Sequence, residues 1–190
     1  MQPKELLDIL RVAEKLKCST RHADTSSGRR ESVAEHSWRA ALMALLLEEE
    51  FPETDINRVI RMCLIHDLGE AFTGDIPAFW KTEEDSCTED RLFDRWVESF
   101  PPAARAEFQS LLEEMTALQT PEAKLYKAID QLEAVIQHNE GDIASWLPLE
   151  YDLQRTYGAE RVTFSPYLTA LKAEIDRWTE RKIAEEGPKN

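Results

Sequence analysis

The sequence predicts an all-α fold, a compact single-domain bundle of helices over residues 1–190. Three observations support this prediction. The chain has only six glycines, runs of β-branched residues are scarce, and apolar residues recur at helical spacing in one segment after another. A length of 190 residues is enough for one domain with a substantial core and is short for two.

The first helix is expected over residues 4–17. Its apolar residues share one helical face: Leu6, Ile9, Leu10, Ala13 and Leu16. The segment 20–30 that follows contains a run of small polar residues around Gly28. We expect a loop there, because the segment is too polar to belong to the core.

The second and third helices have clear boundary signals. Ser32 and Glu35 have the spacing of a capping box, so a helix should start there, with His36 in its first turns, and run to about residue 47. The third helix is expected to begin near Asp55. It should end at the dipeptide His66-Asp67, where glycines at 69 and 74 loosen the backbone.

The second half of the chain continues the helical pattern after a break. Residues 72–88 are expected to be irregular, because they contain a proline and a charged, acidic tail. Prolines at 101–102, 121 and 166 suit a first helical turn. The remaining helices are predicted over residues 89–99, 103–118, 121–138, 149–157 and 166–184.

Composition excludes several classes of protein. Lys and Arg number 23 and Asp and Glu 37, which gives a net charge of −14, so the average surface would repel a nucleic acid. No stretch of the sequence approaches the roughly 20 apolar residues of a membrane span. Three widely spaced cysteines support neither a disulfide framework nor a zinc ribbon. We expect a cytoplasmic protein that binds neither nucleic acid nor membrane.

Four residues with metal-binding side chains are expected on helices: His36, His66, Asp67 and Asp130. The first three lie in line with apolar residues of their helices. Mixed nitrogen and oxygen donors suit a divalent ion such as Mn, Fe, Co, Ni or Mg. Each residue also has a simpler interpretation. A lone histidine on an apolar face is more often a core residue, and Asp130 alone could be a surface partner of a nearby lysine.

The strings around these residues carry a specific signal: VAEHSW, LIHDLGEAFTGDIP and KAIDQLEAV. They resemble the motifs of the HD-domain metal-dependent phosphohydrolases, in particular the YfbR-like 5′-deoxynucleotidase branch. The resemblance implies a helical bundle of HD-domain type with a motif core of about residues 31–140. It also implies that His36, His66, Asp67 and Asp130 ligate one divalent metal ion, whose identity among Co, Mn, Mg, Fe and Ni stays open.

Further site residues are implied by the same resemblance. Glu70 matches a glutamate that acts on the attacking water, and Asp75 matches a second active-site acid. Arg21 matches an arginine that contacts the substrate phosphate, a role that suits its fork of donors. Where the branch commonly has tryptophan after that arginine, this chain has His22. Together with Arg29 and Arg30, His22 is a candidate for binding additional phosphate groups, although the two arginines could simply pair with nearby glutamates.

The resulting hypothesis is a metal-dependent phosphohydrolase that removes phosphate from small nucleotides, foremost (deoxy)nucleoside 5′-monophosphates. One alternative is an enzyme for nucleoside diphosphates, triphosphates or nucleotide analogues, because the segment after Arg21 departs from the branch pattern. Another is a non-catalytic, metal-stabilised helical interaction module, for which only general amphipathicity argues. The partner is then a small nucleotide, and a homodimer is possible.

Overall fold

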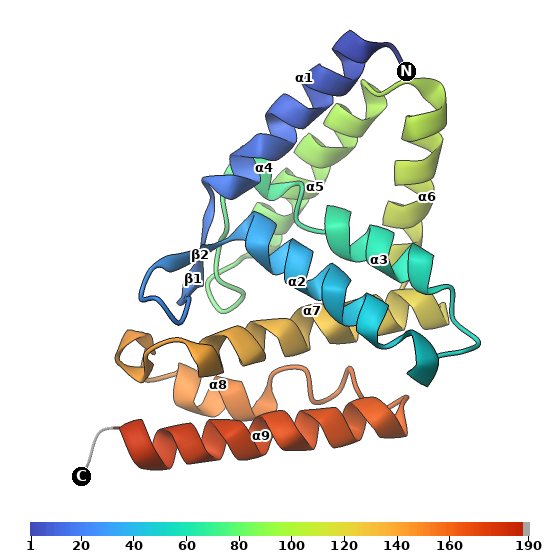
Figure 1. Ribbon diagram of the computed structural model, residues 1–190. Helices are drawn as coiled ribbons and strands as arrows, with labels where there is room; N and C mark the ends of the chain where they lie inside the picture. Colours follow the sequence, from blue (N-terminus) through green and yellow to red (C-terminus); the bar gives the residue numbers. More distant parts are fainter. Residues whose placement is uncertain (188–190) are drawn as a thin grey trace.

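The all-α prediction is confirmed by the computed structural model, which describes residues 1–187 (Figure 1). The α-helices are α1 (Pro3–Ala13), α2 (Val33–Leu46), α3 (Ile56–Ile65), α4 (Glu70–Thr73), α5 (Glu83–Glu98), α6 (Pro102–Ala117), α7 (Pro121–Glu140), α8 (Glu150–Thr156) and α9 (Pro166–Glu186). Short 3-10 turns cover Glu14–Lys17, Glu48–Glu50 and Ile143–Ser145. Two strands, β1 (Thr20–Asp24) and β2 (Arg30–Ser32), complete the described elements.

Helix α7 is the centre of the arrangement. It lies between the α2–α3 pair on one side and α8 and α9 on the other (Figure 1). Several of its apolar residues are fully buried, among them Ala128, Ile129 and Leu132. Helix α2 faces α3 and α7 with the small residues Ala40 and Ala44, both with no exposed surface. Small side chains let helix axes approach closely, so polar residues on α2, α3 and α7 can meet in the middle of the bundle.

The predicted start of α2 is confirmed in detail. The Ser32 backbone N–H donates to Glu35 Oε2 at 2.8 Å, and the Glu35 N–H donates to Ser32 Oγ at 3.3 Å. These reciprocal bonds satisfy two backbone donors that a helix start leaves free. The third helix starts as expected with Asp55 as its cap. Both caps fix where the helices begin, and therefore where His36 and His66 lie.

The loop predicted over residues 20–30 is wrong in part, because β1 and β2 form an antiparallel hairpin. The turn between them includes Gly28, whose φ of +80° favours glycine. The strands are too short and polar for a period-two signal. Helix α7 holds them in place instead, because Gln137 Nε2 on this helix donates to the Asp24 carbonyl at 2.7 Å. Next to it, a Cβ on Gly141 would lie 2.8 Å from the same carbonyl oxygen.

The irregular segment predicted over residues 72–88 is also too long. Helix α5 already begins at Glu83, because Thr82 and Asp85 form a capping box that the acidic composition obscured. Residues 74–82 are the part without helix or strand. Across residues 1–187, no helix combines the length and apolar character needed to cross a bilayer.

Candidate metal centre and adjoining cavity

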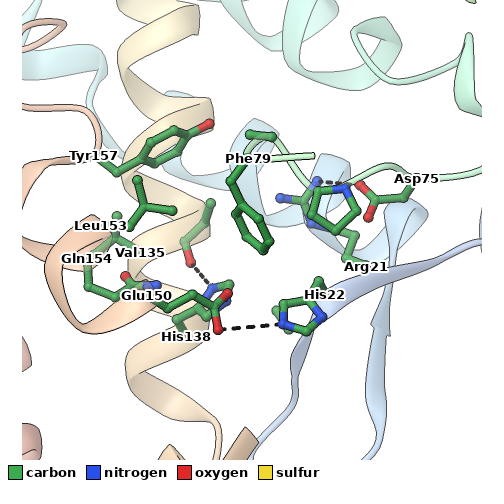
Figure 2. Close-up of a pocket in the computed structure, with 14 residues that line it drawn as sticks. Arg21, His22, Asp75, Phe79, Val135, His138, Glu150, Leu153, Gln154 and Tyr157 are labelled. Atoms are coloured by element: carbon green, nitrogen blue, oxygen red, sulfur yellow. Dashed lines mark hydrogen bonds and ion pairs between the residues drawn. The ribbon is translucent and has the colours of Figure 1, made fainter. Parts of the chain in front are cut away.

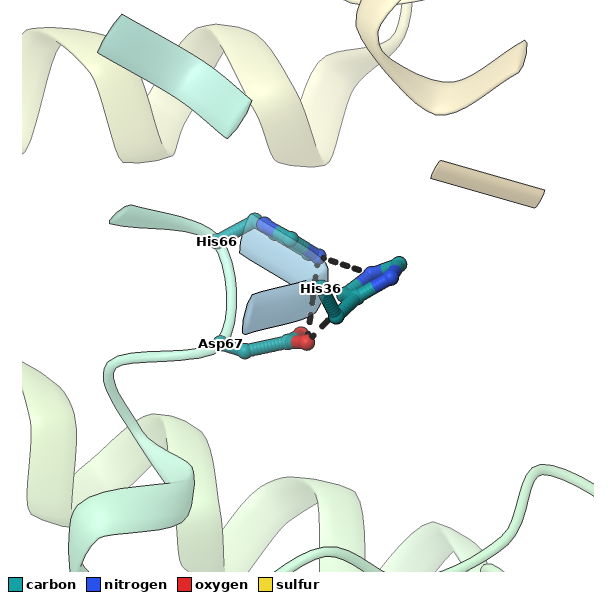
Figure 3. A group of neighbouring side chains, drawn as sticks. All are labelled: His36, His66 and Asp67. Atoms are coloured by element: carbon teal, nitrogen blue, oxygen red, sulfur yellow. Dashed lines mark hydrogen bonds and ion pairs between the residues drawn. The ribbon is translucent and has the colours of Figure 1, made fainter. Parts of the chain in front are cut away.

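Three elements bring the four predicted ligands together. His36 lies in the first turns of α2, His66 and Asp67 lie in the turn that ends α3, and Asp130 lies in the middle of α7. The helix end is what allows two consecutive residues to face one point, since neighbours inside a helix point about 100° apart. Figure 3 shows His36, His66 and Asp67 with their polar atoms converging.

The polar atoms of these residues lie at the distances of ligands around a shared ion. His36 Nε2 is 3.1 Å from His66 Nε2 and 3.2 Å from Asp130 Oδ1. Asp67 Oδ2 is 3.1 Å from His66 Nε2 and 3.8 Å from His36 Nε2. Donor atoms bonded at about 2.0–2.2 Å to one metal ion are separated by such distances. His36 has no exposed surface, so the group is closed to solvent on that side.

Outer hydrogen bonds determine which histidine nitrogens face the centre. His66 Nδ1 donates to the Cys63 carbonyl at 2.8 Å, and His36 Nδ1 is held by the buried carboxylate of Glu133. With both Nδ1 atoms engaged, the two Nε2 atoms present their lone pairs to each other and to two carboxylates. Such a set of acceptors fits a divalent cation, and carboxylate or carbonyl partners on the second nitrogen are the usual support for metal-binding histidines.

The electrostatics of the cluster favour positive charge. Burial lowers the pKa of His66, but the carboxylates of Asp67 and Asp130 outweigh it and raise that pKa to about 10. Burial raises the pKa of Asp67, yet His66, His36 and Arg21 hold it well below its usual range. Carboxylates that stay ionised in a buried site require a cation. The arrangement is therefore able to hold a metal ion.

Glu70 and Asp75 lie beside this cluster. Glu70 is the first residue of α4 and is 6% exposed, and the described chain offers its Oε2 no hydrogen-bond partner. Burial, together with the charges of Asp67 and Asp75, raises its pKa to about 9. Asp75 follows Gly74, whose φ of +78° redirects the chain after α4. Burial raises the pKa of Asp75 as well.

Arg21 on β1 connects the cluster to the surface. Its Nη1 atom lies 3.4 Å from Asp67 Oδ2 and 3.9 Å from Asp75 Oδ1, and its Nε atom lies 3.3 Å from Glu31 Oε2. The Arg21 side chain is 17% exposed. The hairpin thus places a guanidinium between the predicted ligands and solvent, where an anion can reach it.

A cavity with about 540 Å³ of empty space, partly open to solvent, begins at Arg21 and Asp75 (Figure 2). Its apolar walls include Phe79, Val135, Leu153 and Tyr157. The opposite side is polar and consists of His22, His138, Glu150 and Gln154.

Sequence reasoning placed some of these residues and missed others. His22 lines the cavity, whereas Arg29 and Arg30 do not. Arg29 forms a forked pair with Glu35, and Arg30 lies 3.4 Å from Asp24. His138, which stands in none of the sequence motifs, lines the cavity, and its Nε2 atom lies 3.1 Å from Glu150 Oε1. Glu150 and Gln154 have no motif around them, and only the packing of α8 brings them to this wall.

A helical bundle whose centre holds two histidines and two aspartates in mutual contact defines a protein with a candidate metal site. The class can be stated more closely. A family profile described as HD domain matches residues 13–172. The chain belongs to the HD-domain family, and the resemblance predicted from the sequence strings is confirmed.

Individual relatives agree with this assignment. The chain is 30% identical over 186 residues to human 5′-deoxynucleotidase HDDC2, covering 95% of this chain and 89% of the relative. A predicted metal-dependent phosphohydrolase from Magnetospirillum magnetotacticum MS-1 superposes with a TM-score of 0.79 at 29% identity, over 94% of this chain and 95% of that one. The relatives are thus enzymes of the kind that the sequence predicts.

A more distant neighbour shares the fold. The HD phosphohydrolase DatZ of cyanophage S-2L, described as bound to dA and one catalytic Zn²⁺ ion, has a TM-score of 0.56 at 23% identity. The match covers 97% of this chain and 98% of that one. At this identity the likeness supports the fold, and the ligands belong to that protein.

Proposed function

We propose that this chain is a divalent-metal-dependent phosphohydrolase that releases inorganic phosphate from deoxynucleoside 5′-monophosphates. One observation carries the proposal: the convergent histidine and aspartate atoms lie beside Arg21, which also lines the adjoining cavity. The name of the human relative, which shares 30% identity over most of both chains, supports the choice of substrate.

In this proposal His36, His66, Asp67 and Asp130 hold the metal ion. When bound, such an ion supplies Lewis-acid chemistry: it stabilises negative charge on a phosphate oxygen and acidifies a water molecule. The protein positions these atoms and keeps the ligands in one protonation state. Glu133 and the Cys63 carbonyl do so by holding the Nδ1 atoms of the two histidines.

Arg21 binds the phosphate. Its guanidinium is surrounded by the carboxylates of Glu31, Asp67 and Asp75, which hold it at the end of the cavity before substrate arrives. A phosphate dianion offers paired oxygens that match the guanidinium fork, and such charge-assisted bonds are roughly twice as strong as neutral ones. Arg21 then balances the charge that develops during phosphoryl transfer.

Glu70 accepts the proton of the attacking water. Its carboxylate is buried beside the cluster, and its raised pKa of about 9 reflects burial and the negative charges of Asp67 and Asp75. A cation bound in the cluster would favour the ionised form. The ionised carboxylate is suited to a general base, because its Oε2 has no competing hydrogen bond in the described chain.

We propose that the enzyme is cytoplasmic. We expect it to act on free nucleotides, because a net charge of −14 disfavours binding to nucleic acid. The donor set suits Mn, Co, Fe, Ni or Mg, and availability decides among them. Of the three candidates for binding additional phosphate groups, His22 lines the cavity and Arg29 and Arg30 do not, which weakens the triphosphate alternative. A homodimer stays a prediction for sedimentation to test.

Phosphate release from dAMP, AMP and dATP, each with Mn, Co or Mg, tests the proposal. We expect metal-dependent release from dAMP, which a Glu70→Gln variant loses by about 10²–10⁴-fold, the usual contribution of general-base catalysis. Exposed Glu98→Gln is the matched control. Release from dATP alone would move the substrate to the triphosphates. Silence on all three nucleotides with a folded, metal-binding protein would contradict the proposal and favour a non-catalytic module.

A further inference from the structure

The cavity has two chemically different ends. At one end Arg21 and Asp75 adjoin the metal cluster, and at the other lie His22, His138, Glu150 and Gln154 (Figure 2). The proposed phosphate chemistry uses only the first end. The second end is built from polar side chains that are almost entirely buried, since Glu150 is 1% and Gln154 is 4% exposed. Buried polar groups of this kind call for a partner.

Gln154 on α8 lacks that partner. Its Oε1 atom is buried and accepts no hydrogen bond from residues 1–187. An unsatisfied buried acceptor costs about 1–3 kcal/mol, which a ligand with an N–H group in the cavity would remove. The same amide also carries an NH₂ group, so it can accept from one atom of a ligand and donate to the next.

Glu150 is a fixed acceptor next to Gln154. The Leu147 backbone N–H donates to its Oε2 at 2.6 Å, and His138 Nε2 lies 3.1 Å from its Oε1. Burial raises the pKa of Glu150, but the bonds from His138 and Leu147 and the nearby His22 lower it below its usual value. An ionised carboxylate attracts N–H groups and repels carbonyl oxygens.

The walls between the two ends suit a flat ring. Phe79 and Tyr157 contribute aromatic faces or edges, and Val135 and Leu153 contribute aliphatic surface. Aromatic rings pack favourably against aromatic side chains in offset or edge-to-face geometry. The cavity therefore offers, in order, an anion-binding end, apolar walls, and a polar end rich in acceptors.

We propose that the polar end is a nucleobase subsite that selects bases with an exocyclic amino group beside a ring-nitrogen acceptor. Adenine, cytosine and guanine have such an edge, and an amide such as that of Gln154 can pair with it through two bonds. Thymine has no amino group and would place carbonyl oxygens toward Glu150 and Gln154 Oε1. The inference rests on the proposed function for the phosphate end and adds Gln154 as a specificity-determining residue.

The experiment compares kcat/KM for dAMP, dCMP, dGMP and dTMP in the wild type, in Gln154→Leu and in the control Gln109→Leu, which lies on an exposed part of α6. We expect the wild type and the control to prefer dAMP, dCMP and dGMP over dTMP by at least about fivefold, the smaller end of what one bidentate pair supplies. Gln154→Leu should lose this preference, mainly through KM. Its Tm should stay the same or rise, because Oε1 gives up no bond of the free protein.

Equal kcat/KM for the four nucleotides in the wild type would overturn the inference, as would a preference that survives in Gln154→Leu. If none of the four is hydrolysed, the proposed function fails instead, and equilibrium binding of deoxyadenosine and thymidine decides the subsite. Tighter binding of deoxyadenosine that Gln154→Leu abolishes supports it. Equal binding of both nucleosides contradicts it.

Discussion

Helix α7 carries two buried polar clusters that differ in completeness. Near its end, Asn139 and Thr179 of α9 are 2% and 0% exposed and satisfy each other: the Asn139 amide donates to Thr179 Oγ1 at 2.9 Å, and Thr179 Oγ1 lies 3.1 Å from Asn139 Oδ1. Near its middle, Asp130 Oδ1 faces the Nε2 atoms of His36 and His66, and its Oδ2 accepts from Lys127. The first cluster is neutral and is finished by the chain itself, whereas the second gathers ionisable groups that can bind a metal ion.

This contrast separates structural from functional polarity. A neutral, fully paired group holds two helices together and specifies their register. A group of acceptors brought face to face weakens the fold unless something else binds. Buried polar groups without partners are typical of functional sites. Gln154 in the adjoining cavity is a smaller example, because its Oε1 atom has no hydrogen-bond partner in the described chain.

The largest expected effect is on the incomplete cluster. Asp67→Asn removes a carboxylate charge while keeping the shape of the side chain, so we expect metal-dependent phosphate release to fall by at least about 10³-fold, since binding and transition-state stabilisation are lost together. Calorimetric titration with Mn should show the loss of binding. Exposed Asp94→Asn on α5 serves as the control. Rates like those of the wild type in folded Asp67→Asn would refute the ligand assignment.

Binding of a metal ion to the same cluster should stabilise the fold. At a metal concentration of 100 times the dissociation constant, binding to the folded state alone contributes about 2.7 kcal/mol, which corresponds to a rise in Tm of roughly 5–10 °C for a chain of this size. Thermal unfolding with Mn and after chelation measures the shift. A His36→Ala variant should show no such difference. An equal shift in that variant would place the metal elsewhere.

A change in the cluster of Asn139 and Thr179 should lower stability and leave activity unchanged. Thr179→Val leaves the amide of Asn139 without its partner in a fully buried position, and we expect a loss of about 1–3 kcal/mol in the free energy of unfolding. Phosphate release at 25 °C should be unchanged. Denaturant unfolding checks the first statement, with exposed Thr116→Val as the control. A loss of activity without a loss of stability would show that this cluster is not structural.

The last prediction concerns pH in the metal-free protein. The pKa of Glu70 is raised from 4.5 to about 9 by burial, with contributions from Asp67 and Asp75, so the folded state binds a proton that the unfolded state releases. Stability should therefore fall as pH rises from about 5 to 9. Glu70→Gln stays neutral, and its Tm should exceed that of the wild type by an amount that grows across this window. Parallel curves for the two proteins, measured after chelation, would contradict the assigned environment.

The parts predicted from sequence are those with local signals. The cap at Ser32 and Glu35 predicted the start of α2, and the strings around His66 and Asp130 placed four residues that the structure brings into contact. One capping pattern and three short sequence strings that carry a family resemblance were enough for this, because each depends on residues close together in the chain.

The parts that were missed depend on contacts between distant segments. The hairpin has no apolar alternation, and α7 holds it through Gln137 and the Asp24 carbonyl. Glu150 and Gln154 stand in no motif, and they become a wall only because α8 packs across from β1 and His22. His138 shows the same limit: its position eight residues after Asp130 excluded a shared ion but could not reveal a cavity.

The close approach of Gly141 to the Asp24 carbonyl has a consequence for genetics. Any larger residue at position 141 would place its Cβ 2.8 Å from that oxygen and push the hairpin away from α7, and the hairpin carries Arg21 and His22. In a mutational screen for growth or turnover, Gly141 should therefore be as intolerant as a residue that touches substrate. A harmful substitution there would leave every reacting group in the protein, but the hairpin would hold Arg21 in the wrong position.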